Sequence, residues 1–327
     1  MGEVLESRRS EAKSRFGKLQ NSLGAAQTIA GDKACVYATG SYGREEASAY
    51  SDLDLFIVGL GSIDKRKLSN LDEICLKAEL IEATRAQGIP EFSGDGEYLK
   101  HYTQEELIQT IGKRQDDAGN TFTARLLLLL ESKPIIGEGI YSTVIGDVLA
   151  AYWRDYKDHR DEFIPAFLVN DILRLWRTFC VNYEAGTETE PEHKRAKRRL
   201  KNHKLKHSRL LTCYSGLLYL LAVYSAKGSV HPQDAMDMTQ QSPTARLEGL
   251  LADESCQAAH DTIRQLLEHY EHFLQGTSYS EEDLMARFLD AEKRREYSES
   301  SNRLGDLMFQ AIQQLGRGNA LHRVLMV

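Results

Sequence analysis

One short stretch constrains the fold of this chain more than any other: two apolar runs joined by a loop that is rich in glycine and acidic residues. The first run is Ala34–Ala38 and the second is Leu53–Leu60, and both favour β-strands. The loop between them begins with Gly40-Ser41-Tyr42-Gly43 and ends with Ser51-Asp52-Leu53-Asp54. The stretch therefore predicts a strand, a turn and a second strand, with two carboxylates where the second strand begins.

The residue types in this loop suit the binding of a nucleoside triphosphate and its metal ions. Asp52 and Asp54 are two positions apart on a predicted strand, so their side chains project from the same face. Two carboxylates form a hard-oxygen site for Mg²⁺, and a pair of such ions binds both the attacking and the leaving oxygen at phosphorus. Gly40 lets a phosphate approach the backbone, and the Ser41 hydroxyl donates to phosphate oxygens. The alternative is a polar β-hairpin whose aspartates only begin a strand.

The order of these features separates the loop from other acidic pairs. In haloacid-dehalogenase-like phosphatases and many glycosyltransferases the pair follows its strand, whereas here it precedes one. Residues 40–55 read Gly-Ser-Tyr-Gly-Arg-x-Glu, then Tyr-Ser-Asp-x-Asp-Leu. This pattern resembles the DNA polymerase β-like nucleotidyltransferase superfamily, and most of all the N-terminal domain of PII-protein uridylyltransferases and related nucleotidyltransferases.

The resemblance implies an enzyme that moves a nucleoside monophosphate from an NTP to a hydroxyl acceptor and releases pyrophosphate. It implies that Asp52 and Asp54 bind two Mg²⁺ ions, or Mn²⁺, and that Gly40, Ser41 and Arg44 bind the nucleotide. The acceptor is a protein, an RNA or a small molecule. A catalytically inactive nucleotide-binding sensor or scaffold of the same fold is the alternative to the enzyme.

The superfamily also uses a third carboxylate from a later strand, and residues 91–102 offer Asp95 and Glu97. Downstream, Asp116-Asp117 and the helical segment 120–131 resemble the helices that follow this acid. Because the acid then precedes a glycine, the resemblance favours Asp95 as the third metal ligand and catalytic carboxylate. The alternatives are Glu97 and an exposed turn formed by Ser-Gly-Asp-Gly.

The pattern of predicted secondary structure changes near Pro134. Before that point strand signals alternate with helices, and after Gly139 the sequence consists of long helix-periodic segments broken by short turns. We predict an α+β fold, with a nucleotidyltransferase domain of mixed β-sheet and flanking helices over residues 1–139 and an all-helical domain over residues 140–327. The helices expected in the second domain cover residues 141–161, 165–183, 192–226, 243–275 and 281–314.

A basic run extends from Lys194 to Arg209. It contains nine Lys or Arg residues and no acid, in a chain whose net charge is −7. Such a concentration indicates contact with a polyanion and a poor core helix. The resemblance implies that Lys204, Lys206 and Ser208 bind the triphosphate, because the helical domain commonly supplies a Lys and a Ser or Tyr. A solvated helix face and RNA binding are the alternatives.

Composition limits the class of protein. The 327 residues, with 42% hydrophobic and 27% charged, suffice for one large or two modest globular domains. No apolar run reaches the ~20 residues of a membrane helix, so we expect a soluble protein with no membrane partner. The five cysteines are scattered and lack Cys-x-x-Cys spacing, which favours the reducing cytoplasm over a disulfide framework or a zinc site. The base of the NTP and the oligomeric state stay open.

Overall fold

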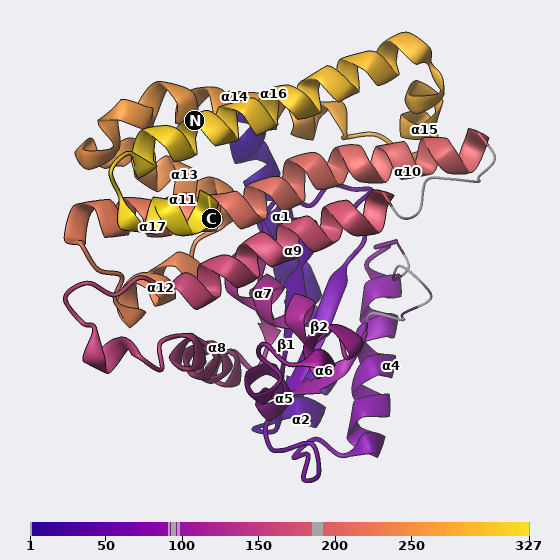
Figure 1. The fold of residues 1–327 in the computed structure, drawn as a ribbon. Helices are drawn as coiled ribbons and strands as arrows, with labels where there is room; N and C mark the ends of the chain where they lie inside the picture. The colour runs from indigo at the N-terminus through magenta and orange to yellow at the C-terminus, as the bar shows by residue number, and fades with distance from the viewer. Residues whose placement is uncertain (1, 91, 93–95, 97–98, 185–191, 327) are drawn as a thin grey trace. The chain divides into compact units, whose positions relative to one another are not determined.

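The computed structural model describes residues 2–90, 92, 96, 99–184 and 192–326 (Figure 1). Its contacts form two compact units, one of Glu3–Arg154 and one that begins at Asp155. The predicted boundary at residue 139 falls at the start of helix α8 (Glu138–Tyr152). This helix packs against strand β1 and helix α5, so it is part of the first unit, and the division comes after Arg154.

The first unit is built on a four-stranded mixed sheet with the strand order β3-β2-β1-β4. β1 (Ala34–Thr39) lies antiparallel to β2 (Asp54–Gly59) and to β4 (Lys133–Ile136). β3 (His101–Thr103) lies parallel to β2. The strand, turn and strand expected from the sequence are confirmed, with the second strand beginning at Asp54.

Helices bury both faces of this sheet, which explains why β1 and β2 are apolar throughout. On one face, Val36 and Ile57 belong to a core that includes residues of α1 (Glu3–Ser22), α2 (Gly24–Ala30) and α4 (Asn70–Ala86). On the other face, the Tyr37 hydroxyl donates to the carbonyl oxygen of Ala124 in α7 (Thr121–Glu131). The remaining helices of the unit are α3 (Gly40–Gly43), α5 (Gln104–Gln109) and α6 (Arg114–Ala118).

The second unit is helical in all its regular elements that the structure describes. Its α-helices are α9 (Ala166–Glu184), α10 (Glu192–Lys204), α11 (Leu210–Lys227), α12 (Pro232–Thr239), α13 (Pro243–Ala252), α14 (His260–Gly276), α15 (Glu281–Leu289), α16 (Ala291–Gly316) and α17 (Ala320–Met326). Two 3₁₀ helices, η2 (Tyr156–Asp158) and η4 (Glu254–Ala259), and a π-helical turn, η3 (Leu205–Arg209), complete it. The predicted α+β domain followed by a helical region is confirmed.

Several helices are shorter than the sequence predicts. The helix expected over residues 141–161 ends at Tyr152. The one expected over residues 243–275 is interrupted where the Asp253 carboxylate accepts a hydrogen bond from the backbone N–H of Ser255. In the same way, Asp290 caps α16 by accepting from the N–H of Lys293, which divides the segment 281–314. Aspartate side chains compete for backbone donors, so they end helices that the apolar periodicity would continue.

Among the described residues, one helical run, Lys194–Lys227, is long and apolar enough to cross a membrane by length and composition. Within its most apolar window, 61% is buried inside the structure. A single run of this kind is weak support for a membrane span, because a buried core helix has the same length and composition.

Candidate active site

The loop between β1 and β2 begins with the single helical turn α3. Gly40 has a φ of +64°, in the left-handed region that favours glycine. A Cβ at this position would lie 2.5 Å from Oδ2 of Asp54. Both the backbone and the approaching carboxylate therefore require glycine here, and the first and last residues of the motif meet in space.

Glu131, at the end of α7, holds this turn in place. Its carboxylate is buried and accepts a hydrogen bond from the backbone N–H of Gly40 at 3.0 Å. Its other carboxylate oxygen accepts from Nη1 of Arg44 at 2.9 Å. A Cβ at Gly43 would collide with the backbone carbonyl oxygen of Glu131, so the second glycine lets α3 pack on the end of α7. No sequence motif points to Glu131, because this contact joins residues far apart in the chain.

Arg44 and Glu46 of the motif form a buried ion cluster with Glu131. Arg44 is 6% exposed, and its Nε lies 2.8 Å from Oε2 of Glu46. We predicted that Arg44 binds the nucleotide. In the structure its guanidinium pairs with two carboxylates inside the unit, which supports a positioning role under the loop.

The two aspartates lie at the start of β2, where the chain is accessible to solvent. Asp54 is partly exposed and pairs with Thr39 in the sheet register, and Asp52 is exposed just before the strand. Leu53, between them, is buried in the core. This alternation agrees with the expectation that the carboxylates share one face and the leucines the other.

The donor set of this face suits a divalent cation. Carboxylate oxygens are the ligands that Mg²⁺ prefers, and Mg²⁺ commonly takes one or two of them with water and substrate phosphates. Among the residues that the structure describes, no group of three or more His, Cys, Asp or Glu is arranged to hold a metal. Asp52 and Asp54 supply the two carboxylate ligands that such an ion needs from the protein when water and substrate phosphates supply the others. The third predicted carboxylate, Asp95, and its alternative Glu97 lie outside the described residues.

The three residues predicted to bind the triphosphate from the helical region lie in the second unit. Lys204 is exposed at the end of α10, and Lys206 is half-buried in η3. Ser208 is buried, and its Oγ accepts a hydrogen bond from the Tyr270 hydroxyl at 3.4 Å. The Ser208 side chain therefore contributes to the packing of the helical unit.

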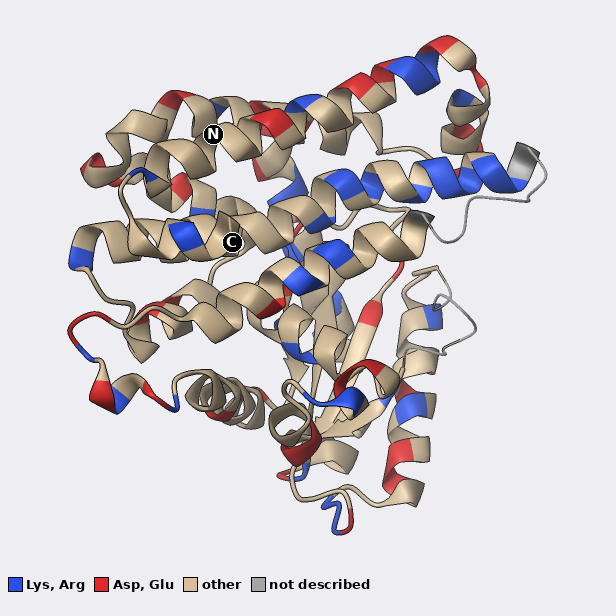
Figure 2. Cartoon of the chain, in the orientation of Figure 1, with Lys and Arg blue, Asp and Glu red and all other residues tan. Residues whose placement is uncertain are grey.

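The basic helix α10 has an apolar side. Figure 2 shows Lys and Arg side by side along α10. Ala196 and Leu200, however, are buried in a core cluster with Phe288 of α15. The expectation of a poor core helix is wrong for this side.

His203 continues the buried side of α10, and His207 follows it in η3. Burial lowers the pKa of His203 to about 4 and that of His207 well below its usual value. The His207 ring stacks on Phe273 with centroids 4.4 Å apart. Burial therefore favours the neutral form of both rings at neutral pH, and the two rings extend the apolar stripe beyond its leucine and alanine residues.

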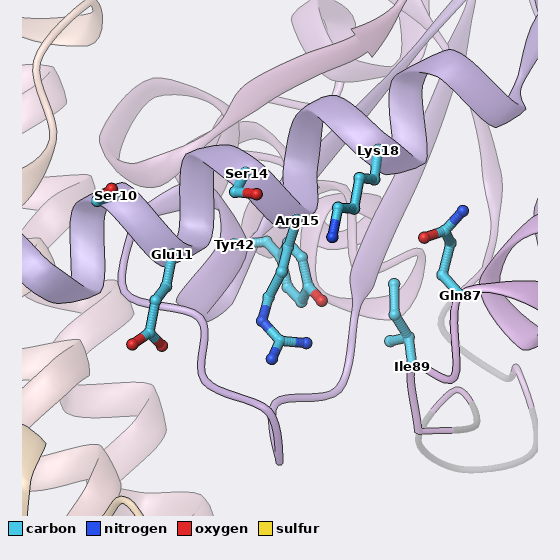
Figure 3. Close-up of a pocket in the computed structure, with 8 residues that line it drawn as sticks. All are labelled: Ser10, Glu11, Ser14, Arg15, Lys18, Tyr42, Gln87 and Ile89. Atoms are coloured by element: carbon cyan, nitrogen blue, oxygen red, sulfur yellow. The ribbon is translucent and has the colours of Figure 1, made fainter.

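A cavity of about 390 Å³ lies beside the α3 turn (Figure 3). It is lined by side chains from three segments of the first unit, namely α1, Tyr42 of α3, and the residues after α4. Tyr42 is buried, and burial raises the pKa of its hydroxyl; the nearby Asp52 charge raises it further, whereas Arg15 lowers it. The cavity therefore adjoins the loop that carries the aspartates.

Comparison with known families agrees with this geometry. Residues 20–105 match the family model described as a nucleotidyltransferase domain, and this range includes β1, α3, β2 and β3. No curated protein and no solved structure matches the chain. The matched residues include the loop from Gly40 to Asp54. The sequence motif lies in this loop, and the structure brings its first and last residues together. The chain therefore contains a nucleotidyltransferase domain at residues 20–105, consistent with the DNA polymerase β-like nucleotidyltransferase superfamily.

Proposed function

We propose that this protein transfers a nucleoside monophosphate from an NTP to a hydroxyl acceptor. The acceptor hydroxyl gives up its proton to a carboxylate of the site or to water, its oxygen forms a bond to the α-phosphorus, the bond from that phosphorus to the α,β-bridging oxygen breaks, and pyrophosphate leaves. The observation that carries the proposal is the close approach of the Asp54 carboxylate to Gly40. A carboxylate in this position would hold a metal ion beside the turn, and phosphoryl transfer depends mainly on such positioning and charge.

Some of the described residues would bind the metal and the phosphates, and others would position the groups that do so. Asp52 and Asp54 would hold Mg²⁺ or Mn²⁺, which supplies positive charge to the phosphates. The partly exposed Ser41 hydroxyl donates to a phosphate oxygen. The N–H of Gly40 already donates to Glu131, and the absence of a Cβ at Gly40 gives room for the Asp54 carboxylate beside the turn. Most of the acceleration comes from orientation and charge, because phosphoryl transfer asks little covalent chemistry of a protein.

Incubation with each α-labelled NTP tests the proposal, with Mg²⁺ or Mn²⁺ and cell extract as the source of acceptors. Label that appears on a protein, an RNA or a small molecule identifies the acceptor class. The inactive sensor or scaffold is favoured instead if calorimetry finds NTP binding while no extract component becomes labelled.

The third carboxylate has its own test. Asp95→Asn is expected to lower turnover severely while NTP binding is kept, because the phosphate contacts and the first two carboxylates remain. Glu97→Gln serves as the matched variant. If Glu97→Gln abolishes turnover and Asp95→Asn does not, Glu97 is the third carboxylate.

The proposed contribution of Lys204 and Lys206 is tested by replacing both with alanine. If the two ammonium groups bind the triphosphate, NTP affinity falls by at least about tenfold. Replacement of Arg195 and Arg198, which lie earlier on α10, changes the net charge equally and should spare NTP affinity. Equal NTP affinity in the wild type and the lysine variant would assign the basic run to a solvated face.

A further inference from the structure

The cavity beside the α3 turn has no role in the reaction as described so far (Figure 3). Its lining comprises Ser10, Glu11, Ser14, Arg15 and Lys18 of α1, Tyr42 of α3, and Gln87 and Ile89 after α4. Its volume of about 390 Å³ lies in the range of small-molecule sites, ~300–1,000 Å³. All of these residues belong to the first unit.

Two cations of α1 face this cavity. Arg15 and Lys18 are three positions apart, so they lie on the same side of the helix. Figure 3 shows both side chains extending from α1 toward the space in front of Tyr42. Among the described residues neither forms an ion pair. Glu11 is the acid of the lining, so the lining side chains together favour an anion.

The Tyr42 hydroxyl is the third group that points to a ligand. Tyr42 is 2% exposed, and its hydroxyl makes no hydrogen bond of normal geometry to a described residue, although the Arg15 side chain lies close enough to interact with it. A buried hydroxyl with incomplete hydrogen bonding is destabilising, and a ligand oxygen that accepts from it would relieve this. Burial raises the pKa of this hydroxyl, so it stays protonated at neutral pH and can donate. Figure 3 shows it between Arg15 and Lys18.

We propose that this cavity is a polyphosphate subsite in which Arg15, Lys18 and the Tyr42 hydroxyl bind the phosphates of the NTP and of the pyrophosphate that it leaves. The identity of the ligand rests on the proposed function. Tyr42 follows Gly40 by two positions in the same turn, and Gly40 lies against the Asp54 carboxylate. A phosphate in the cavity therefore lies beside the turn that meets Asp54, one of the two carboxylates that would hold the metal. Guanidinium, ammonium and phenol groups all donate to phosphate oxygens.

Calorimetric titration of the full chain with inorganic tripolyphosphate, without divalent metal, tests the subsite. The double variant Arg15→Ala/Lys18→Ala is expected to bind tripolyphosphate at least about tenfold more weakly than the wild type. Tyr42→Phe removes only the hydroxyl and is expected to weaken binding about threefold. Circular dichroism verifies that each variant is folded.

Lys13→Glu is the matched control. Lys13 is an exposed residue of α1 outside the cavity lining, and this substitution lowers the net charge by the same amount as the double variant. Wild-type affinity in Lys13→Glu supports a specific site. Equal tripolyphosphate affinity in the wild type and the double variant overturns the subsite, as does an equal loss in the control.

Two further measurements are needed. One distinguishes the phosphates of the NTP from the phosphate of an acceptor, and the other distinguishes the subsite from the proposed function. A rise in the KM for the NTP in the double variant supports the assignment, whereas a rise only in the KM for a phosphorylated acceptor overturns it. Tripolyphosphate binding needs no turnover. A protein that shows the expected binding but labels no acceptor therefore refutes the proposed function and keeps the subsite.

Discussion

Gly40→Ala should damage the active-site loop both in stability and in activity. Alanine at a φ of +64° costs roughly 1–2 kcal/mol in the backbone alone. Its Cβ would lie 2.5 Å from Oδ2 of Asp54, whereas ordinary contacts begin at 3.4 Å, so the carboxylate must retreat by about 1 Å. A displacement of that size at a reacting centre costs about a hundredfold in rate.

Urea unfolding measures the first effect and the initial rate of label transfer measures the second. Gly139→Ala in α8 is the control, because Gly139 has an ordinary φ and a Cβ there meets no atom within 4 Å. The control should equal the wild type in rate and equal or slightly exceed it in the free energy of unfolding. A Gly40→Ala protein with wild-type stability and rate would refute the argument that Asp54 and Gly40 must meet.

Two further predictions concern groups buried inside each unit. Arg125→Ala is expected to destabilise the first unit by about 3–5 kcal/mol in urea unfolding, because it removes the cation that lies 2.7 Å from the fully buried Asp116 carboxylate. Arg264→Ala, which breaks an exposed pair with Asp261, should cost no more than about 1 kcal/mol, and a similar loss in both variants would contradict the reasoning. Acid should destabilise the second unit, because the pKa of His203 is about 4 in the fold and about 6.5 when unfolded, so the unfolded state binds more protons between these values. Stability should fall by up to about 3 kcal/mol as pH decreases through that window, and a melting-temperature profile that is the same in His203→Leu would exclude this source.

The elements predicted best from the sequence are those whose causes are local. β1, α3 and β2 are neighbours in the chain, and their glycines and aspartates carry the chemical reasons for the turn. The domain order followed from a change in periodicity that needs no long-range contact. The buried ion cluster of Arg44 and Glu46 could not be seen in this way, because its third member, Glu131, lies 91 residues from the glycine that it holds.

Only the charge of the basic run, and not the burial of its histidines, could be predicted from the sequence. Its charges are plain, but the burial of His203 and His207 depends on aromatic partners from α14 and α15 that lie far along the chain. A histidine counts as polar until burial shows it to be neutral. The cavity at α1 was missed for a similar reason, since Arg15 and Lys18 are ordinary helix cations until the fold sets Tyr42 between them.

The most direct test of the account compares label transfer by the wild type with transfer by Asp52→Ala and Asp54→Ala. We expect transfer by the wild type in the presence of Mg²⁺ or Mn²⁺ and none by either variant. Without metal, each variant should melt at the wild-type temperature or above, because removing one carboxylate relieves repulsion between the pair. Unchanged transfer rates in both folded variants would contradict the assignment of these two carboxylates as the metal-binding centre of a nucleotidyltransferase.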